Sequence, residues 1–314
     1  MGSSRNPFPT RGACAKAGRV SHMFTGTFTA IVTPFHQGKV DEAALTRLIR
    51  AQIKGGVSGI VPVGTTGESP TLDFDEHIRV IELAVKVADG RIPVIAGTGA
   101  NSTREAIYLT QRAETVGAHA SLQVAPYYNK PSQEGLYEHF KAIAQSTRLP
   151  LMLYSIPGRC GIEIGIDTVI RLATDCPTVV SIKEAGGSCD RVSQLRAALP
   201  PKFTILSGDD SLALPFMSVG ASGVVSVASN VAPRAVSQMV SRFLAGDLRG
   251  ARKLHAKLFP LFRNLFVESN PVPVKAALAL LGQMEAEVRL PLVPASAHCR
   301  TIVEQTLRDL GMLA

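Results

Sequence analysis

Residues 178–187 read Thr-Val-Val-Ser-Ile-Lys-Glu-Ala-Gly-Gly, and this stretch predicts both the fold class and the chemistry of the chain. Val179, Val180 and Ile182 form a β-branched apolar run, which is typical of a strand buried on both faces in a parallel sheet. Lys183 closes that run. Burial disfavours the charged ammonium, so an unpaired lysine here would have a lowered pKa and would be nucleophilic near neutral pH. A Schiff-base lysine needs this property. The alternative is a lysine whose ammonium reaches water beyond the strand end.

Around this strand, short apolar runs alternate with longer amphipathic ones. The helical segment 73–87 is an example, because Ile78, Ile81 and Val85 form an apolar stripe. Eight such alternations predict an α/β fold, a closed (β/α)8 TIM barrel, since parallel strands need crossover helices. An open doubly wound sheet is the competing fold, but no GxGxxG follows the first strand. The predicted strands are 27–34, 59–64, 92–97, 120–126, 150–157, 178–184, 203–208 and 223–228.

The chain divides into three parts. Residues 1–22 contain four basic residues and no acid, and we expect them to lie outside the fold, as an expression leader or an organelle transit peptide, with Met23 as the true start. Residues 23–231 make the barrel through its eighth strand. Residues 232–314 contain the last barrel helix and a C-terminal helical extension, because eight units already close a barrel.

Composition excludes several classes of protein. The 314 residues are 46% hydrophobic and 18% charged, as in a well-packed globular protein. The net charge of +8 is scattered along the chain and there is no Trp, which argues against a nucleic-acid surface. Five cysteines without a CxxC pair indicate a reduced, cytoplasmic protein, and neither cysteines nor histidines have the spacing of a metal site. No apolar run reaches the length of a membrane span.

Polar side chains gather at predicted strand ends, where barrels carry their catalytic groups. The segment 64–69 (Gly-Thr-Thr-Gly-Glu-Ser) can bring amides and hydroxyls close to a carboxylate, although a Gly/Thr turn is also a common loop. Segment 126–131 carries paired tyrosines, which suit a proton relay, a subunit contact or plain packing. In segment 154–159, Tyr154 would point into the barrel mouth and Arg159 could hold a carboxylate in a bidentate fork.

As a set, six stretches resemble the dihydrodipicolinate synthase family of pyruvate-dependent class I aldolases, and the resemblance covers residues 23–314. Each stretch is weak alone, whereas the combination is specific. One departure from the family pattern is Ser155, where an Asn usually follows the tyrosine. The stretches are 64–69, 126–131, 154–159, 181–185, 207–210 (Ser-Gly-Asp-Asp) and 270–275 (Asn-Pro-Val-Pro-Val-Lys).

The resemblance implies that pyruvate forms an imine with Lys183 and that the resulting enamine attacks aspartate semialdehyde. The product would be 4-hydroxy-tetrahydrodipicolinate, on the route to diaminopimelate and lysine. The catalytic residues would be Lys183, Tyr154, Thr65 and Tyr128, of which the last reaches a neighbouring subunit's site. The implied substrate contacts are Thr66, Val225, Arg159 and Gly208.

The resemblance also implies a homotetramer with no cofactor beyond the covalent imine, acting on small molecules and on neither nucleic acid nor membrane. Sialic-acid lyases, keto-deoxy-sugar aldolases and hydroxyproline-pathway enzymes share the Lys and Tyr and stay open as alternatives. Arg159 and the Thr-Thr pair favour a short acidic aldehyde over a sugar. A catalytically inactive ligand-binding barrel is the alternative from another class.

Many members of this family bind lysine, the end product of the pathway, at a subunit interface. The matching residues here are Ser69, His77, Asn101, Glu105 and Tyr127. Pro70 and Phe74 depart from the pattern of lysine-sensitive members, which carry an alanine and a histidine there. Because a phenyl ring makes no hydrogen bond of this kind, we expect weak inhibition by lysine or none.

Overall fold

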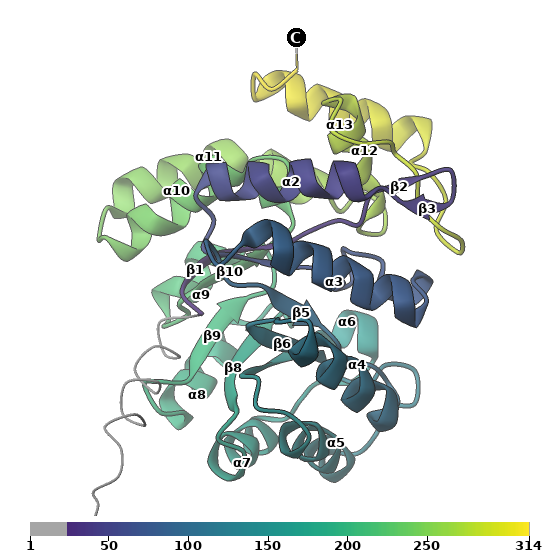
Figure 1. Cartoon of the computed structure of the whole chain (residues 1–314). Helices are drawn as coiled ribbons and strands as arrows, with labels where there is room; N and C mark the ends of the chain where they lie inside the picture. The colour runs from purple at the N-terminus through teal and green to yellow at the C-terminus, as the bar shows by residue number, and fades with distance from the viewer. Residues whose placement is uncertain (1–23, 314) are drawn as a thin grey trace, which may run out of the picture.

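Eight short parallel strands form the centre of the computed structural model, which describes residues 24–313 (Figure 1). They pair in the order β4-β1-β10-β9-β8-β7-β6-β5. The two outermost strands also meet, through a bridge between Ile60 and Val94 and a 3.1 Å hydrogen bond from Ile60 N to Pro93 O, so the sheet closes on itself. The predicted TIM barrel is therefore confirmed. The strands are β1 (Gly26–Ala30), β4 (Gly59–Val61), β5 (Ile95–Gly97), β6 (Ala120–Val124), β7 (Leu151–Ser155), β8 (Val179–Glu184), β9 (Thr204–Ser207) and β10 (Gly223–Ser226). Residues 1–22 and Met23 lie outside the described part of the chain.

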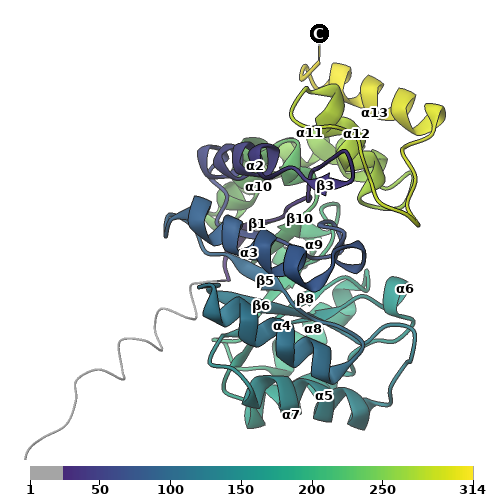
Figure 2. The ribbon, with the colours of Figure 1, turned by 45° about the vertical axis from the view of Figure 1, so that its right-hand side comes forward.

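Helices alternate with the strands and cover the outside of the barrel (Figures 1 and 2). Their starts follow from local chemistry. In α3, the Asp73 side chain accepts from Glu76 N at 2.8 Å and the Glu76 side chain accepts from Asp73 N at 3.4 Å, which forms a capping box. The barrel helices are α2 (Glu42–Gly55), α3 (Phe74–Ala88), α4 (Thr103–Thr115), α5 (Gln133–Gln145), α7 (Ile166–Asp175), α8 (Cys189–Ala198), α9 (Ala213–Ser218) and α10 (Pro233–Leu244), with the short α6 (Pro157–Cys160) after β7.

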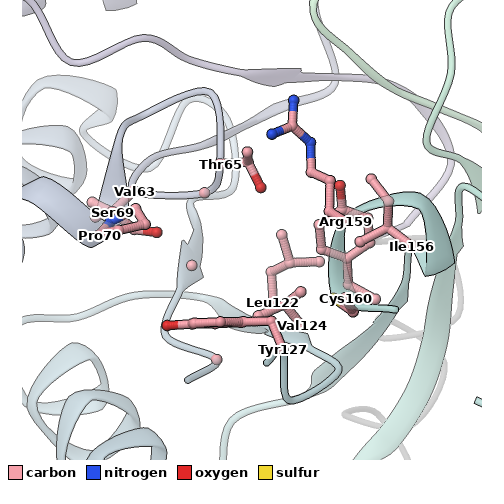
Figure 3. A pocket seen from close by; sticks show the side chains of 14 residues that line it. Val63, Thr65, Ser69, Pro70, Leu122, Val124, Tyr127, Ile156, Arg159 and Cys160 are labelled. Carbon is pink, nitrogen blue, oxygen red and sulfur yellow. The ribbon is translucent and has the colours of Figure 1, made fainter. Parts of the chain in front are cut away.

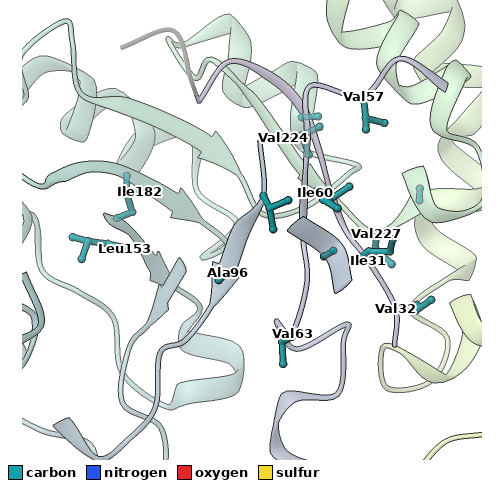
Figure 4. Packing of buried hydrophobic residues seen from close by; sticks show 14 of the residues in the cluster. Ile31, Val32, Val57, Ile60, Val63, Ala96, Leu153, Ile182, Val224 and Val227 are labelled. Carbon is teal, nitrogen blue, oxygen red and sulfur yellow. The ribbon is translucent and has the colours of Figure 1, made fainter. Parts of the chain in front are cut away.

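Strand parity divides the core into two layers. Leu153 and Ile182 are register partners that face the surrounding helices, in the cluster shown in Figure 4. Their neighbours Tyr154 and Lys183 are also register partners and have the opposite parity, so they point into the barrel. The interior cluster around them includes Phe28 and Leu206. The pairing of β8 with β7 skips Val180, between Leu151–Val179 and Met152–Ser181, and beyond this irregularity the alternation of the strand places Lys183 in the interior.

Three C-terminal helices lie at one end of the molecule, beside α2 (Figures 1 and 2). They are α11 (Leu248–Asn264), α12 (Val272–Leu280) and α13 (Ala297–Asp309). The segment between α12 and α13 contacts a hairpin of β2 (Phe35–His36) and β3 (Lys39–Val40), where Gly38 N donates to the Glu287 carboxylate at 2.7 Å. None of the helices that the structure describes is both long and apolar enough to span a bilayer.

The C-terminal extension also reaches the loop after β4 through a buried ion pair. The Lys275 ammonium of α12 contacts the Glu68 carboxylate, and both side chains are 0% exposed. Glu68 accepts a second bond from Arg289 N at 3.1 Å. Because Glu68 follows the Thr65-Thr66 pair closely, the extension fixes a loop that leads into the barrel mouth.

Candidate active site

Lys183 lies inside the barrel without an ion-pair partner among residues 24–313. Its side chain is 7% exposed, and its Nζ lies 3.9 Å from the centroid of the Tyr154 ring on β7. Burial and the positive charge of Arg159 outweigh the opposing charge of Asp210 and lower the pKa of Lys183 to about 7. A substantial share of the amine is therefore neutral near pH 7, as a nucleophilic lysine requires.

Lys275 is buried as well, but it has a different environment. Its ammonium is paired with Glu68 and lies 4.1 Å from the centroid of the Phe35 ring. The carboxylate and the ring both stabilise the protonated form of this amine, so it is a poor nucleophile. Of these two lysines, Lys183 is the one suited to attack a carbonyl.

Gly208 allows the loop after β9 to approach the lysine closely. A Cβ atom at this position would lie 2.7 Å from Ala185 Cβ and 3.0 Å from Lys183 Cε. Gly208 N also donates to Glu184 O at 2.7 Å, which holds the loop against β8. A side chain at position 208 would therefore displace the lysine.

An inner cavity of about 40 Å³ adjoins the lysine. Of the predicted site residues, Thr65, Thr66, Tyr154, Arg159, Lys183 and Gly208 all line it. Val225 does not. It is buried in the interior cluster on β10, while Val227, just beyond the end of that strand, lines the cavity.

Tyr154 remains a neutral phenol at physiological pH. Burial raises its pKa to about 12, while Arg159 and a hydrogen bond with Thr65 act against that rise. A phenol in this state is a proton donor. It acts as a base only after a partner has taken its proton. The Thr65 hydroxyl on the opposite wall is in place to be such a partner.

Asn270, just before α12, connects two cavity walls. Its Nδ2 donates to Thr66 Oγ1 at 2.9 Å, and its backbone oxygen accepts from Arg159 Nη2 at 3.2 Å. Thr66 therefore keeps its own hydroxyl proton for a ligand carboxylate. The sequence stretch 270–275 carries the resemblance, but its contact with the β4 loop was not predicted.

A second, outer chamber of about 200 Å³ adjoins the inner cavity. Figure 3 shows Thr65 and Arg159 on one side of it and the Tyr127 ring on the other. Ser69 and Pro70 line it too, so Ser69 and Tyr127 of the predicted lysine set share a chamber with catalytic candidates.

Of the remaining residues of the lysine set, Asn101 and Glu105 interact with Tyr127. Asn101 Nδ2 donates to Tyr127 O at 3.2 Å, and burial together with the charge of Glu105 raises the pKa of the Tyr127 phenol. His77 is buried, its Nε2 lies 2.8 Å from Gly97 O, and burial lowers its pKa to about 4. His77 is therefore a neutral, structural hydrogen-bonding group in this chain. Phe74 lies at the start of α3, half exposed, with its ring 5.7 Å from that of Tyr108.

Tyr128 lies apart from the rest of the site. It is 90% exposed, has a backbone φ of 74°, and lines neither chamber. The pair of tyrosines at 127 and 128 thus splits, one facing the chamber of its own chain and the other facing outward.

Residues 23–310 match the dihydrodipicolinate synthetase family (DHDPS). The 4-hydroxy-tetrahydrodipicolinate synthase of Aquifex aeolicus is 50% identical over 290 residues, which covers 92% of this chain and 99% of that protein. Among solved structures, the 4-hydroxy-tetrahydrodipicolinate synthase of Methylacidiphilum fumariolicum is 56% identical, with a TM-score of 0.90 over 91% of this chain and 96% of that one. The DHDPS of Cyanidioschyzon merolae, solved with lysine bound, is 41% identical, with a TM-score of 0.91 over 93% of this chain and 100% of that one.

Proposed function

Because this chain belongs to the dihydrodipicolinate synthetase family, we propose that Lys183 is the residue that forms an imine with pyruvate. The enzyme is a lyase that forms 4-hydroxy-tetrahydrodipicolinate from pyruvate and aspartate semialdehyde, in the biosynthesis of diaminopimelate and lysine. The observation that carries the assignment of Lys183 is an unpaired amine, buried in the barrel mouth, with a pKa of about 7. No separate cofactor takes part, because the imine itself withdraws electrons from the pyruvate carbon skeleton.

The chemistry follows from the groups around the amine. The neutral Lys183 amine adds to C2 of pyruvate, and the resulting hydroxyl leaves as water after receiving a proton. Tyr154 supplies that proton as a phenol, and Thr65 passes protons to and from it. Loss of a methyl proton then gives an enamine, whose carbon attacks the aldehyde.

Two anchors orient the substrates. The Thr66 hydroxyl binds the pyruvate carboxylate, since its oxygen already accepts from Asn270 and its proton is free to donate. Gly208 leaves room for pyruvate beside Lys183, and Val225 supports the cavity floor from the interior cluster. Arg159 binds the carboxylate of aspartate semialdehyde with its guanidinium.

The assignment of Lys183 is tested by trapping with borohydride in the presence of pyruvate. Reduction converts the imine into a stable amine, and peptide mapping then locates the added mass. We expect the label on Lys183 and none on Lys275, which is also buried and serves as an internal control. Lys183→Ala and Lys183→Arg should both lose the label and the activity, because guanidinium stays protonated. A label on Lys275 in the wild-type enzyme would refute the assignment.

We also propose that the enzyme is a homotetramer in which Tyr128 completes the site of a neighbouring subunit. An exposed phenol held at a φ of 74° suits insertion into a partner better than service in its own chain. Mixing Tyr128→Phe subunits with Lys183→Ala subunits tests this. A hybrid would contain one intact site, with Lys183 from one subunit and Tyr128 from the other, so activity should return on mixing. Two inactive variants that stay inactive after verified subunit exchange would contradict a role in trans.

We propose a cytoplasmic location as well. Cys160, Cys176, Cys189 and Cys299 are free thiols, which suits a reducing compartment. Fractionation of the native cells, followed by the enzyme assay, would test this location, and activity in an oxidising compartment would contradict it.

A further inference from the structure

The loop after β9 carries a second ionisable group close to Lys183. Asp210 lies two residues beyond Gly208, the residue whose Cβ would touch the lysine side chain. The Asp210 Oδ2 atom accepts from the backbone amides of Val227 and Ala228, each at 2.9 Å. Val227 and Gly208 both line the inner cavity. Asp210 therefore ties together two loops, after β9 and after β10, that both line the cavity around Lys183.

The other oxygen of this carboxylate is unused. Asp210 is 1% exposed, and its Oδ1 atom is buried without a hydrogen-bond partner among the described residues. Burial raises the pKa of Asp210 to about 6, against the effect of the nearby Ser226 hydroxyl and of the two amide hydrogen bonds. At pH 8 the group is thus an anion, and a buried anion with an unsatisfied oxygen gains from a nearby positive charge.

Imine formation places such a charge beside it. The neutral amine adds to the pyruvate carbonyl, the hydroxyl leaves as water with one proton, and the resulting C=N⁺ carries a positive charge that bulk water does not reach. The charged and titratable groups that act on Lys183 are Arg159, which disfavours a positive charge there, Asp210, which favours it, and the neutral phenol of Tyr154. Asp209 also acts on Asp210 and helps to raise its pKa.

We propose that Asp210 is the counter-ion of the imine, and that its buried carboxylate stabilises the positive charge on the adduct of Lys183 and pyruvate. This inference rests on the Schiff-base function proposed for Lys183. Asp210 transfers no proton in this role. It acts through the field at the lysine nitrogen, and its hydrogen bonds to the β10 loop hold it in place.

Asp210→Asn separates this role from a structural one. An asparagine oxygen can accept from the same two amides, so the loop is kept while the charge is lost. We expect the pyruvate concentration that gives half-maximal borohydride trapping to rise about ten- to hundredfold, the equivalent of one to two pKa units. At the same time the free lysine should lose its proton more readily, so the acid limb of the trapping rate should move to lower pH. A disturbed loop alone would not be expected to weaken adduct formation and also move the acid limb of the trapping rate to lower pH.

Two variants control the experiment. Asp209→Asn is the matched control. It keeps an oxygen for Ser211, whose amide and hydroxyl contact the Asp209 carboxylate at 2.8 and 2.9 Å. It should leave the half-saturating pyruvate concentration unchanged at pH 8, where Asp210 is an anion with or without the charge of Asp209. Arg159→Ala removes the opposing charge and should move the acid limb to higher pH. If Asp210→Asn fails to fold by its melting curve, Asp210→Glu keeps the charge and must keep the acid limb at the wild-type pH.

The outcomes are distinguishable. Wild-type enzyme that forms no adduct would overturn the Schiff-base function itself. An adduct in the wild type, together with unchanged half-saturation and acid limb in folded Asp210→Asn, would overturn the counter-ion role alone. An acid limb that moves in Asp210→Glu would overturn it too.

Discussion

Lys275→Met should destabilise the enzyme strongly, because it leaves the Glu68 carboxylate buried without its cation. Both side chains are 0% exposed, and after the change Glu68 keeps only the amide of Arg289 as a hydrogen-bond donor. Breaking a buried pair in this way costs about 3–5 kcal/mol of folding free energy. At roughly 2–4 °C per kcal/mol, the melting temperature should fall by about 6–20 °C. Because Glu68 follows the Thr65-Thr66 pair, kcat should fall as well.

Thermal unfolding followed by circular dichroism, at one fixed protein concentration, measures the effect. The double variant Glu68→Gln/Lys275→Met removes the remaining charge and keeps an oxygen for Arg289 N, so it should recover most of the loss. Glu304→Gln breaks an exposed pair with Arg308, whose side chains are 41% and 46% exposed, and should change stability by about 0.5 kcal/mol or less. A double variant as unstable as Lys275→Met would refute the explanation by an uncompensated charge.

Three further predictions concern the site. Arg159→Ala should lower kcat/KM for aspartate semialdehyde about ten- to hundredfold and leave the pyruvate adduct intact. Steady-state kinetics measures the first effect and borohydride trapping the second. Loss of the adduct with unchanged kcat/KM for aspartate semialdehyde would contradict this role. Gly208→Ala should displace Lys183 and slow adduct formation. Gly158→Ala, whose new Cβ would have no atom within 4 Å, should leave the rate of adduct formation unchanged. Equal rates of adduct formation in both variants would contradict the steric argument. Lysine should inhibit the wild type weakly and Phe74→His more strongly, since a ring that cannot hydrogen-bond costs a desolvated ligand about 1–3 kcal/mol. Half-inhibition of the wild type at submillimolar lysine would argue against this expectation.

Much of the fold could be predicted because each barrel strand leaves a local signal. The apolar run 178–184 became β8, and its parity alone predicts that Lys183 faces the side opposite to Ile182. The Asp73-x-x-Glu76 pair similarly marks the start of α3. These signals depend only on neighbours in the sequence.

The features that sequence reasoning missed have no such signal. The β2–β3 hairpin consists of two-residue strands, too short for any periodicity, around Gln37 and Gly38 with φ of 52° and 77°. The predicted strand 27–34 ends at Ala30 instead. The contact of Asn270 with Thr66 spans 204 positions, so it depends on how the extension packs and on no local pattern.

Closure of the barrel has a consequence for synthesis on the ribosome. Strand β1 emerges early, yet one of its two neighbours, β10, begins only at Gly223. Asn230, just beyond β10, also bonds both Ala30 O and Val32 N, so the first strand lacks these contacts as well until late in translation. Until then a nascent chain presents an open strand edge and the buried rings of Phe24 and Phe28, which invite pairing with other chains. The risk of such pairing is therefore greatest between the synthesis of the first and the last strand, and a ribosome stalled before residue 223 holds a chain that cannot close its barrel.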